Sequence, residues 1–476
     1  MTSALVVGSG PNGLAAAITL AREGVNVTVV EASDSIGGGL RSSELTLPGL
    51  LHDHCAAIVP TAVSSPFMQS LDLETHGVRW AWPDIDLAHP LDDGSAGIMC
   101  RSLERTVEGL GRDGRRWKQV FGPLSRNYDV LANDLLSPVV KIPGNPLRLG
   151  VFGAAAMLPA AAMMRLFSTA EAQALFAGNA AHAWTPLSRP PSAAVALMLG
   201  AVAHRYGWPA VAGGTARLAA GLASILRSHG GRTETGICVN TADQIGGFDL
   251  VLYDTNPGLP AKLLGDRIPP RIRRVLARYR YGSAAFKVDF AVHGGIPWAN
   301  PATRRAGTVH VCGNAREVAA AERDTFNGRM PQRPFVIVAQ QALVDSGRAV
   351  GNLTPIYAYA HVPHGYAGDA TESIVAQIER FAPGFRDRIA AIAACSPADL
   401  ERGNPNNVGG DINGGSMDLR TFFARPRLSA NPYWLGVPGH YLCSSATPPG
   451  GGVHGMCGHL AARNALKDHG IATPPS

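Results

Sequence analysis

Short apolar runs and a helical pattern alternate over the first thirty residues. Residues 4–7 are an apolar run of strand length, a helical pattern follows up to Glu23, and residues 25–30 form a second apolar run. Gly24 separates the helix from the second run, as is typical of a residue just past a helix end. Apolar runs joined by a helix predict buried parallel strands, so the chain opens with a β-α-β unit of the α/β class.

A similar alternation returns in the middle and at the end of the chain. The middle part predicts a glycine-rich turn and helix at residues 212–225 and strands at 236–240 and 249–254. The C-terminal part predicts a strand at 441–444, a glycine turn at 448–455 and a helix at 459–466. Because helix–strand alternation extends a parallel sheet, we expect both parts to join the sheet that the N-terminus begins.

The segments between these parts have other patterns. Helices are predicted at residues 103–110 and 117–136. Apolar or alternating runs of strand length occur at 284–292, 308–312, 335–340 and 356–361. Further helices are predicted at 317–323, 373–381 and 385–394. This pattern predicts a second domain with a mixed or antiparallel sheet.

Residues 151–164 are a stretch of 14 residues without a charge, with a proline at position 159. A membrane-spanning helix needs about 20 apolar residues, so this stretch is not predicted to cross a bilayer. One expectation is a buried helix pair. The alternative is that the stretch lines an apolar substrate tunnel or makes a peripheral membrane contact, with Arg148 and Arg165 at its ends.

Composition and charge narrow the class of protein. The chain has 476 residues, 46% of them hydrophobic, which predicts two or three globular domains. Its net charge of +6 comes from Lys and Arg spread along the chain, so nucleic-acid binding is not expected. Seven cysteines without C-x-x-C spacing indicate neither a disulfide framework nor a zinc site. No signal-peptide pattern opens the sequence, and a cytoplasmic location is expected.

The first predicted strand is followed by glycines in the order G-x-G-x-x-G. Gly8 permits a tight turn, Gly10 lets the backbone approach a pyrophosphate, and Gly13 lets the helix lie close to the strand. The N–H groups of the helix N-terminus can then bind the anion. The intervening residues are expected to line the same site: Ser9, Pro11 and Asn12.

An acid and a second glycine element complete the nucleotide pattern. Glu31, followed by Ala32, ends the second strand about 20 residues after the glycines, where a carboxylate binds ribose hydroxyls and disfavours a phosphorylated ribose. The second element, which can wrap a pyrophosphate from the other side, consists of Gly37, Gly38, Gly39, Leu40 and Arg41. This arrangement resembles the second fingerprint of FAD enzymes of the amine oxidase and phytoene desaturase superfamily, and it favours FAD over NAD.

Residues 52–55, His-Asp-His-Cys, are a further cluster of reactive side chains. Such a cluster invites a metal or a covalent flavin link. A metal site, however, needs three or four ligands placed by the fold, and no matching cluster occurs elsewhere in the sequence. We therefore expect no metal and a non-covalent flavin, with this cluster in a loop near the flavin or the substrate.

The resemblance becomes specific when the motifs are taken together. The sequence GSGPNGL near the start, VAGGTARL in the middle and PGGGVHGM near the end are similar to motifs of the phytoene desaturase and carotenoid-isomerase-like flavoproteins. The nearest branch is that of the phytoene dehydrogenase-related, or pyridine nucleotide-disulfide oxidoreductase domain-containing, proteins. Three further segments match that branch: AYAHVP at 358–363, APGFRD at 382–387 and NPNNVGGDINGGS at 404–416. The resemblance covers nearly the whole chain.

The resemblance implies a Rossmann-like FAD-binding domain of the glutathione reductase type with an inserted mixed α+β substrate domain. The FAD domain would be discontinuous, comprising residues 1–78, 205–260 and 430–476, and the substrate domain, with its helical part, would comprise 79–204 and 261–429. By position, the residues at the isoalloxazine or its ribityl chain would be Gly452, Val453, His454 and Gly455. Val239, on the strand after the middle helix, would pair its backbone with the adenine.

Two departures from carotenoid desaturases cast doubt on carotene as the substrate. His454 stands where those enzymes tend to have an apolar residue or proline, and the segment from Val239 to Asp249 is short. The resemblance still implies an FAD-dependent dehydrogenase, desaturase or isomerase-like enzyme. Such an enzyme transfers a hydride from a C–C or C–X bond of a small apolar substrate to flavin N5.

The proton that accompanies the hydride goes to a base or to the flavin itself. The candidates for the base are His454, Asp411 and His54, and for each a structural role is the stronger expectation.

Two other functions stay open. A flavin-fold protein that binds a lipid or a partner without turnover is disfavoured by the intact nucleotide motifs. An amine oxidase would need an aromatic cage at the flavin, which an aromatic content of 7% does not support.

Overall fold

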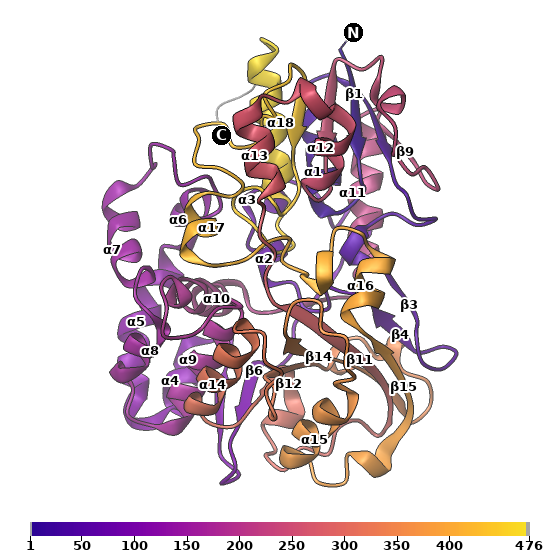
Figure 1. The fold of residues 1–476 in the computed structure, drawn as a ribbon. Coiled ribbons are helices and arrows are strands. Elements are labelled where there is room, and N and C mark those ends of the chain that lie inside the picture. The colour runs from indigo at the N-terminus through magenta and orange to yellow at the C-terminus, as the bar shows by residue number, and fades with distance from the viewer. Residues whose placement is uncertain (1, 473–476) are drawn as a thin grey trace.

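Five parallel strands form the sheet in the upper part of Figure 1. The computed structural model describes residues 2–472. In sheet order the strands are β16 (His440–Leu442), β10 (Leu250–Tyr253), β1 (Ser3–Val7), β2 (Asn26–Val30) and β9 (Arg232–Glu234). Neighbouring strands of this sheet come from three separate parts of the chain. The α/β class and the Rossmann-like sheet expected from the sequence are confirmed.

Both faces of this sheet are covered by helices. Side chains alternate between the two faces of a strand, so Ala4 and Val6 pack on one side while Leu5 and Val7 pack on the other. The first side carries helices α1 (Pro11–Arg22), α11 (Ala216–Ser228) and α18 (Met456–Asp468). The second side carries α12 (Gly258–Leu264) and α13 (Pro270–Ala277). Burial of both faces explains why the strands read as continuous apolar runs.

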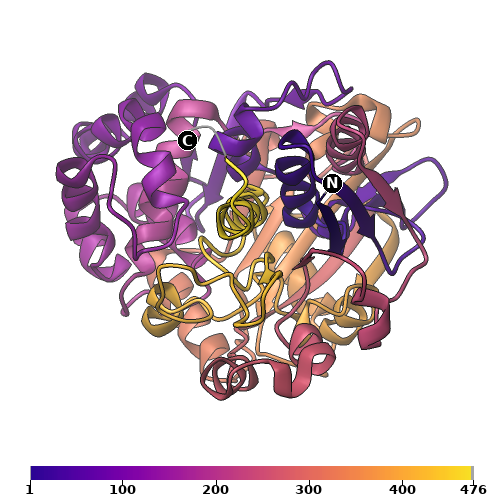
Figure 2. The ribbon, with the colours of Figure 1, turned by 90° about the horizontal axis from the view of Figure 1, so that it is seen from above.

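The C-terminal helix lies directly on the N-terminal one. Seen from above, α18 in yellow stands beside the indigo α1 (Figure 2). A Cβ on Gly458 of α18 would lie only 1.7 Å from the Asn12 carbonyl oxygen of α1, so the two helices can approach this closely only with glycine at that position.

A seven-stranded mixed sheet forms the lower part of the molecule. Its neighbours are antiparallel except β12 and β6, which are parallel. In sheet order the strands are β15 (Ile389–Cys395), β11 (Ala284–His293), β14 (Leu353–Val362), β13 (Val336–Ala339), β12 (Ala306–Val311), β6 (Ile85–Pro90) and β7 (Ala96–Met99). The expected mixed sheet is therefore present.

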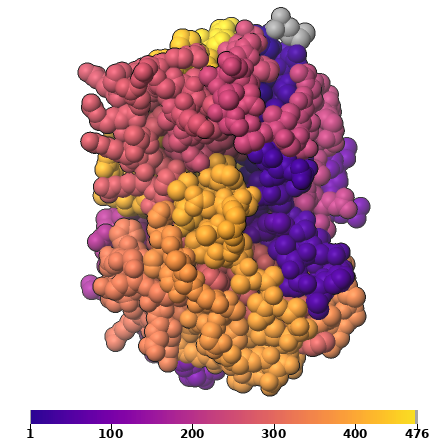
Figure 3. Space-filling model, turned by 45° about the vertical axis from the view of Figure 1, so that its right-hand side comes forward, coloured from indigo at the N-terminus to yellow at the C-terminus, as the bar shows by residue number. Residues whose placement is uncertain are grey.

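Two pairs of short strands and several short helices complete the connections. The strand pairs are β3 (Ser42–Glu44) with β4 (Leu51–Asp53), and β5 (Trp80–Ala81) with β8 (Ala210–Val211). The short helices are α2 (Pro60–Val63), α3 (Pro66–Gln69), α16 (Pro397–Gly403) and α17 (Leu419–Phe423). In the space-filling view, the gold segment near residue 400 lies between the two halves, beside the indigo N-terminal segment (Figure 3).

A helical part packs beside the mixed sheet, at the lower left of Figure 1. Its helices are α4 (Leu103–Gly109), α5 (Gly114–Arg126), α6 (Tyr128–Leu135), α7 (Pro146–Ala156), α8 (Ala160–Met163), α9 (Ala170–Ala181), α10 (Ser192–Tyr206) and α14 (Ala315–Phe326). Aromatic rings fill its core, with Trp117 and Phe121 at 4.4 Å between ring centroids. The helix predicted at 117–136 is two helices, because the chain leaves helical geometry at Asn127.

Helices α7 and α8 meet the expectation of a buried pair only in part. Within α7 only Phe152 and Ala156 are buried, whereas Leu147 and Val151 are 81% and 71% exposed. Within residues 2–472, no single helix is long and apolar enough to cross a membrane. The stretch that runs through α7 and on to Leu166 has the length and composition to do so, but it bends by 90°.

Two expected elements are wrong in type or position. The helix predicted at 385–394 is the strand β15 preceded by a short turn, Arg386–Arg388. Alanine favours helices, but here pairing with β11 along one edge of the sheet overrides that propensity. The strand predicted at 236–240 lies earlier in the chain, at β9 (Arg232–Glu234). It ends before Gly236, because this residue has a φ of +72°, which is outside extended geometry.

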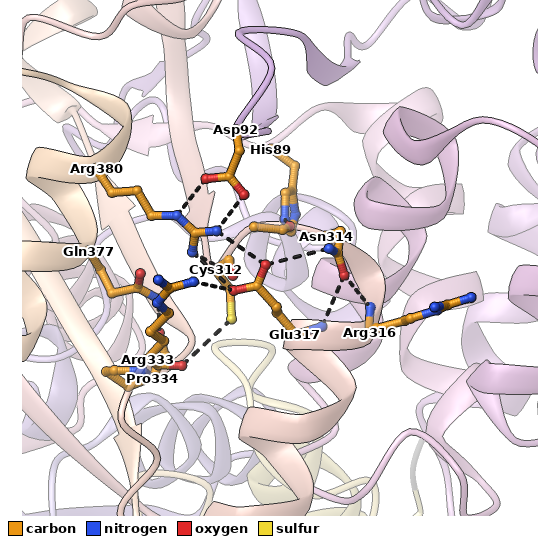
Figure 4. Close-up of polar contacts among 11 residues, drawn as sticks. His89, Asp92, Cys312, Asn314, Arg316, Glu317, Arg333, Pro334, Gln377 and Arg380 are labelled. Carbon is orange, nitrogen blue, oxygen red and sulfur yellow. Dashed lines mark hydrogen bonds and ion pairs between the residues drawn. The ribbon is translucent and has the colours of Figure 1, made fainter.

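A network around Arg380 joins the helical part to the mixed sheet (Figure 4). Arg380 lies on α15 (Thr371–Phe381) and forms ion pairs with Asp92, between β6 and β7, and with Glu317 of α14. Glu317 also pairs with Arg333, before β13. One guanidinium thus connects three elements that are distant in the sequence.

A buried ion pair connects the two halves of the molecule. Asp53, at the end of β4, accepts hydrogen bonds from the Arg348 guanidinium at 2.7 Å and from the Thr215 amide, at the start of α11, at 2.8 Å. Ser42 of β3 donates to the same carboxylate at 2.6 Å. Arg348 also donates to the Val211 carbonyl at 2.8 Å. The carboxylate therefore holds together segments that begin near residues 42, 211 and 348.

We expect Arg348→Met to lower the free energy of unfolding by about 3–5 kcal/mol, because it leaves the buried Asp53 carboxylate without its charged partner. The control is Arg386→Met, which breaks an exposed pair with Glu372 and should cost about 1 kcal/mol or less. Urea denaturation followed by tryptophan fluorescence at neutral pH measures both. Equal losses in the two variants would contradict this account.

Candidate active site

A cavity of about 700 Å³ opens between the two sheets. At one end it is lined by the glycine turn after β1, the end of β2 and residues 38–41. At the other end it is lined by α10, by β13 and β14 of the mixed sheet, and by the turn before α18. Cavities of this size, with apolar walls and a few converging polar groups, are typical of cofactor and substrate sites.

The glycine turn after β1 is closely packed against the end of β10. Gly8 has a φ of +101°, and a Cβ added there would lie 2.7 Å from the Asp254 carbonyl oxygen. A Cβ on Gly13 would lie 2.1 Å from the Gly8 carbonyl oxygen. Only glycine fits at these positions. The turn thereby brings the N-terminus of α1 to the cavity.

The Glu31 carboxylate lies across the same turn. Its Oε2 accepts hydrogen bonds from the Ser9 amide at 3.0 Å and the Ser9 hydroxyl at 2.6 Å, and its Oε1 accepts one from the Ser33 amide. These contacts orient the acid toward the cavity, which it lines.

The second glycine element touches the first. A Cβ on Gly38 would lie 3.1 Å from the Cα of Gly10, so the two elements share one wall. Arg41 lines the cavity while its guanidinium donates to the carbonyl oxygens of Gly38 and Gly403 and to the Ser33 hydroxyl. Arg41 thus brings a positive charge to this end of the cavity and also holds the C-terminal end of α16.

Most residues proposed from the sequence to bind the cofactor line this cavity. They are Gly8, Ser9, Gly10, Pro11, Asn12, Glu31, Ala32, Gly38, Gly39, Leu40, Arg41, Val239, Gly452 and Val453. Val239 lies in the loop after β9 rather than on a strand. Gly13, His454 and Gly455 lie behind the lining, where Gly455 packs against Phe67 and Ala15.

His454 is buried and holds the glycine turn before α18. Its Nδ1 accepts a hydrogen bond from the Met456 amide at 3.1 Å, so its Nε2 carries the proton and donates to the Gly450 carbonyl at 3.1 Å. Burial, together with the nearby Arg425 charge, lowers the pKa of His454 to about 4. The imidazole is neutral, and both of its nitrogens are engaged by the backbone of the turn.

Asp411 and His54 lie outside the cavity lining and have structural partners. The buried Asp411 carboxylate accepts hydrogen bonds from the backbone amides of Gly282, Asn413 and Gly415, and so shapes the loop that precedes α17. His54 shares a hydrogen bond with the Ser43 hydroxyl at 2.7 Å. In the 52–55 cluster it is Cys55 that lines the cavity.

Aromatic walls are the main feature that the sequence did not reveal. Five aromatic side chains line the substrate end: Trp184, Trp208, Tyr281, Tyr357 and Tyr359. Trp184 has a φ of +52°, the one positive φ outside glycine in residues 2–472. Such strain in a non-glycine residue concentrates at functional sites. Overall aromatic content carries no such signal, but the alternation of Tyr357, Tyr359 and His361 on β14 does, since residues two apart share a face.

A row of buried histidines leads away from the cavity. His182 lines the cavity, and its Nε2 lies 2.9 Å from the Nε2 of His310. The Nδ1 atoms of His310 and His89 lie 2.4 and 2.8 Å from the point where a Gly178 Cβ would be. Burial lowers the pKa of His182 to about 3 and that of His89 to about 4, so both rings are neutral. These residues are far apart in the sequence, which offers no signal for the cluster.

No group of three or more metal-binding side chains occurs in the part of the chain that the structure describes.

Comparison with known proteins points to an oxidoreductase. A model of the NAD(P)-binding Rossmann-like domain family matches residues 6–72. The pyridine nucleotide-disulfide oxidoreductase domain-containing protein 2 of Rattus norvegicus is 25% identical over 98% of this chain and 93% of its own length. A limonene dehydrogenase component of Castellaniella defragrans is 30% identical over 28% of this chain and 24% of its own.

A solved structure shares the whole fold. Cyclohexylamine oxidase from Brevibacterium oxydans superposes with a TM-score of 0.58 and 14% identity, covering 98% of this chain and 99% of the other. The sequence relatives support an oxidoreductase, and the solved structure supports the fold. The sequence relatives also support the resemblance to the pyridine nucleotide-disulfide oxidoreductase branch, while the resemblance to phytoene desaturase stays a prediction.

The buried neutral His454 predicts a loss of stability in mild acid. In the unfolded chain this histidine takes up a proton below its ordinary pKa of 6.5, whereas in the folded protein it stays neutral down to about pH 4. Unfolding therefore takes up one proton in this window, and stability falls as the pH falls. Between pH 6 and 4.5, wild type should lose about 1.4 kcal/mol more per pH unit than His454→Gln. Urea titrations at several pH values test this, and equal slopes would contradict it.

Proposed function

We propose that this protein is an FAD-dependent oxidoreductase that acts on an apolar substrate. One observation carries the proposal: a single cavity joins a dinucleotide-type site, built from the glycine turn and Glu31, to a chamber with apolar and aromatic walls. A cofactor held at the first end and extending along the cavity would meet a substrate at the second.

The residues present fit such a cofactor. The turn from Gly8 to Asn12 offers a glycine-lined wall and a helix N-terminus for a pyrophosphate, with Arg41 close by. Glu31 would accept hydrogen bonds from the ribose hydroxyls. Gly452 and Val453 line the cavity where the ring system would lie. When bound, FAD would supply the acceptor for a hydride, which carries two electrons and one proton.

The protein's own side chains bind the substrate and exclude water. Met198 and Leu199 of α10, Ile337 of β13 and the ring of Trp184 line the chamber and favour an apolar molecule. Among the residues that the structure describes, His182 is the one histidine that lines the cavity. Because its Nε2 faces His310, its Nδ1 is the ring nitrogen left to form a hydrogen bond with a substrate.

Amine oxidation is the second candidate. Trp184 and Tyr359 lie nearly parallel, at 7° between ring planes and 6.1 Å between centroids, and both line the cavity. Electron-rich ring faces attract a cationic or polarised amine. The structural neighbour named as an amine oxidase has the same fold, but at 14% identity that likeness concerns the fold alone.

The purified protein should be yellow and should release its FAD when it is denatured in acid. Gly10→Val should abolish FAD retention, because the new side chain would stand in the turn. Even a Cβ added at Gly10 would lie only 2.6 Å from the Asp254 carboxylate. Glu31→Ala should weaken FAD binding by about 1–3 kcal/mol, the loss expected for hydrogen bonds to a charged acceptor. Gel filtration followed by absorption spectra measures retention.

The control for these variants is Gly109→Val, on the exposed end of α4, where no atom lies within 4 Å of an added Cβ. Retention of FAD by Gly10→Val at the control's level would refute the nucleotide site. Binding of NAD in place of FAD would refute the proposal that the cofactor is FAD. The substrate class is tested by anaerobic mixing with cyclic alkenes or with alicyclic amines, and bleaching of the flavin by only one class decides between the two candidates.

We further propose that the surface of residues 137–166 rests on an anionic membrane, from which an apolar substrate would reach the protein. Ile142 is 91% exposed, and the exposed apolar residues Leu147 and Val151 follow on α7. Residues 137–168 carry Lys141, Arg148 and Arg165 but no acidic residue, so the charge is complementary to anionic lipid. Apolar and basic residues together on an amphipathic helix are typical of interfacial binding.

We expect wild type to sediment with vesicles of phosphatidylglycerol and phosphatidylcholine, and less with phosphatidylcholine alone. The double variant Leu147→Asp and Val151→Asp should reduce the bound fraction about tenfold or more, since each apolar side chain withdrawn from water contributes about 1.5–3 kcal/mol. The control is Leu343→Asp with Val350→Asp, another pair of exposed apolar residues. Equal binding by both double variants would overturn this proposal. So would a wild-type protein that does not bind vesicles and instead forms a dimer that the Leu147→Asp and Val151→Asp changes disrupt.

A further inference from the structure

A carboxyl group lies inside the glycine turn. Asp254 follows β10 and is buried, and its Oδ2 accepts a hydrogen bond from the Gly13 amide at 2.8 Å. The same oxygen lies 2.6 Å from the point where a Gly10 Cβ would be. Asp254 also lines the cavity. This carboxyl therefore occupies the N-terminus of α1, where the glycine motif presents its amides to an anion.

The groups around Asp254 do not neutralise its charge. Glu31, at the end of β2, is a second acid at the same turn, and it raises the pKa of Asp254. From the other elements, the thiols of Cys443, after β16, and Cys457, on α18, face the carboxyl. Burial raises the pKa of Asp254 to about 7, although the Gly13 and Gly10 amides act in the opposite direction.

A pyrophosphate at this turn would bring two further negative charges to the carboxyl. Like charges in a buried site disfavour each other's ionised form. An ionised Asp254 would therefore oppose the nucleotide, whereas a protonated Asp254 has a hydroxyl that can donate a hydrogen bond to a phosphate oxygen.

We propose that Asp254 is a positioning residue of the nucleotide site that carries a proton when a pyrophosphate is bound at the glycine turn. The inference rests on the proposed FAD function. Binding of FAD is then coupled to the uptake of one proton, and the acid acts as a hydrogen-bond donor to the cofactor. In the alternative, Asp254 stays ionised as a cap of α1, which its two amide contacts also permit, and binding takes up no proton.

The two roles predict different pH dependences. If binding requires the protonated acid, affinity is nearly constant below the pKa of about 7 and falls about tenfold per pH unit above it. From pH 6.5 to 8.5, the dissociation constant of FAD should rise about 25-fold in wild type. Asp254→Asn, which offers an amide donor of similar shape without an ionisable proton, should change less than about twofold over the same range and should bind more tightly than wild type at pH 8.5.

The experiment measures the dissociation constant of FAD for the apoprotein by flavin fluorescence at pH 6.5, 7.5 and 8.5 and constant ionic strength. Calorimetry in two buffers of different ionisation enthalpy counts the protons taken up at pH 8. The matched control is Asp411→Asn, a change to another buried carboxyl that accepts backbone hydrogen bonds but lies outside the cavity lining. It should keep the wild-type slope.

A constant affinity in wild type, the absence of proton uptake, or a wild-type slope in Asp254→Asn would overturn the proposal. If Asp254→Asn does not fold, the wild-type slope and proton count still decide between the two roles. FAD binding without pH dependence overturns the role of Asp254 alone. The absence of FAD binding to wild type at every pH would overturn the proposed function as well.

Discussion

The shape of the cavity depends on the interactions of the buried Asp53 carboxylate, above all its ion pair with Arg348. Its partners are Arg348, in the connection between β13 and β14, and the Thr215 amide, at the start of α11 in the nucleotide half. The residues that follow Asp53, from Cys55 to Ile58, form part of the cavity wall. A buried ion pair stabilises a fold only when its remaining hydrogen bonds are satisfied, and here backbone and hydroxyl donors satisfy them. These hydrogen bonds thereby fix the position of one half of the molecule, and of its end of the cavity, relative to the other.

Much of the nucleotide half could be predicted from the sequence because its signals are local. The strand, glycines, helix and acid from Ala4 to Glu31 follow one another within thirty residues, and each residue type has a steric or electrostatic reason for its place. The strand β15 could not be predicted in the same way. Its alanines and isoleucines suit either a helix or a strand, and only the hydrogen-bonding edge of β11, a hundred residues earlier, decides between them.

The candidate site likewise has residues that the sequence predicts and residues that it does not. The residues at the nucleotide end were identified because they lie in contiguous motifs. The chamber is different, since Tyr359 of β14 meets His182 and Trp184, at the end of α9, only after the mixed sheet and the helical part have packed. The direction of a side chain is also invisible in the sequence. His454 stands in the expected turn, yet its ring faces the Gly450 carbonyl and the Met456 amide rather than the cavity.

The strand order of the nucleotide sheet also bears on how the protein is made. Strand β1 lies between β10 and β2, and β16 completes the edge, so a chain emerging from the ribosome has no native partner on one side of β1 until residue 253 has been made. Helix α18 reaches α1 later still. Pairings across such sequence separations are slow to form, and strand edges left open in the meantime can pair with other chains. The five-stranded sheet is therefore completed late in biosynthesis, and β1 keeps an open edge until the later strands have been made.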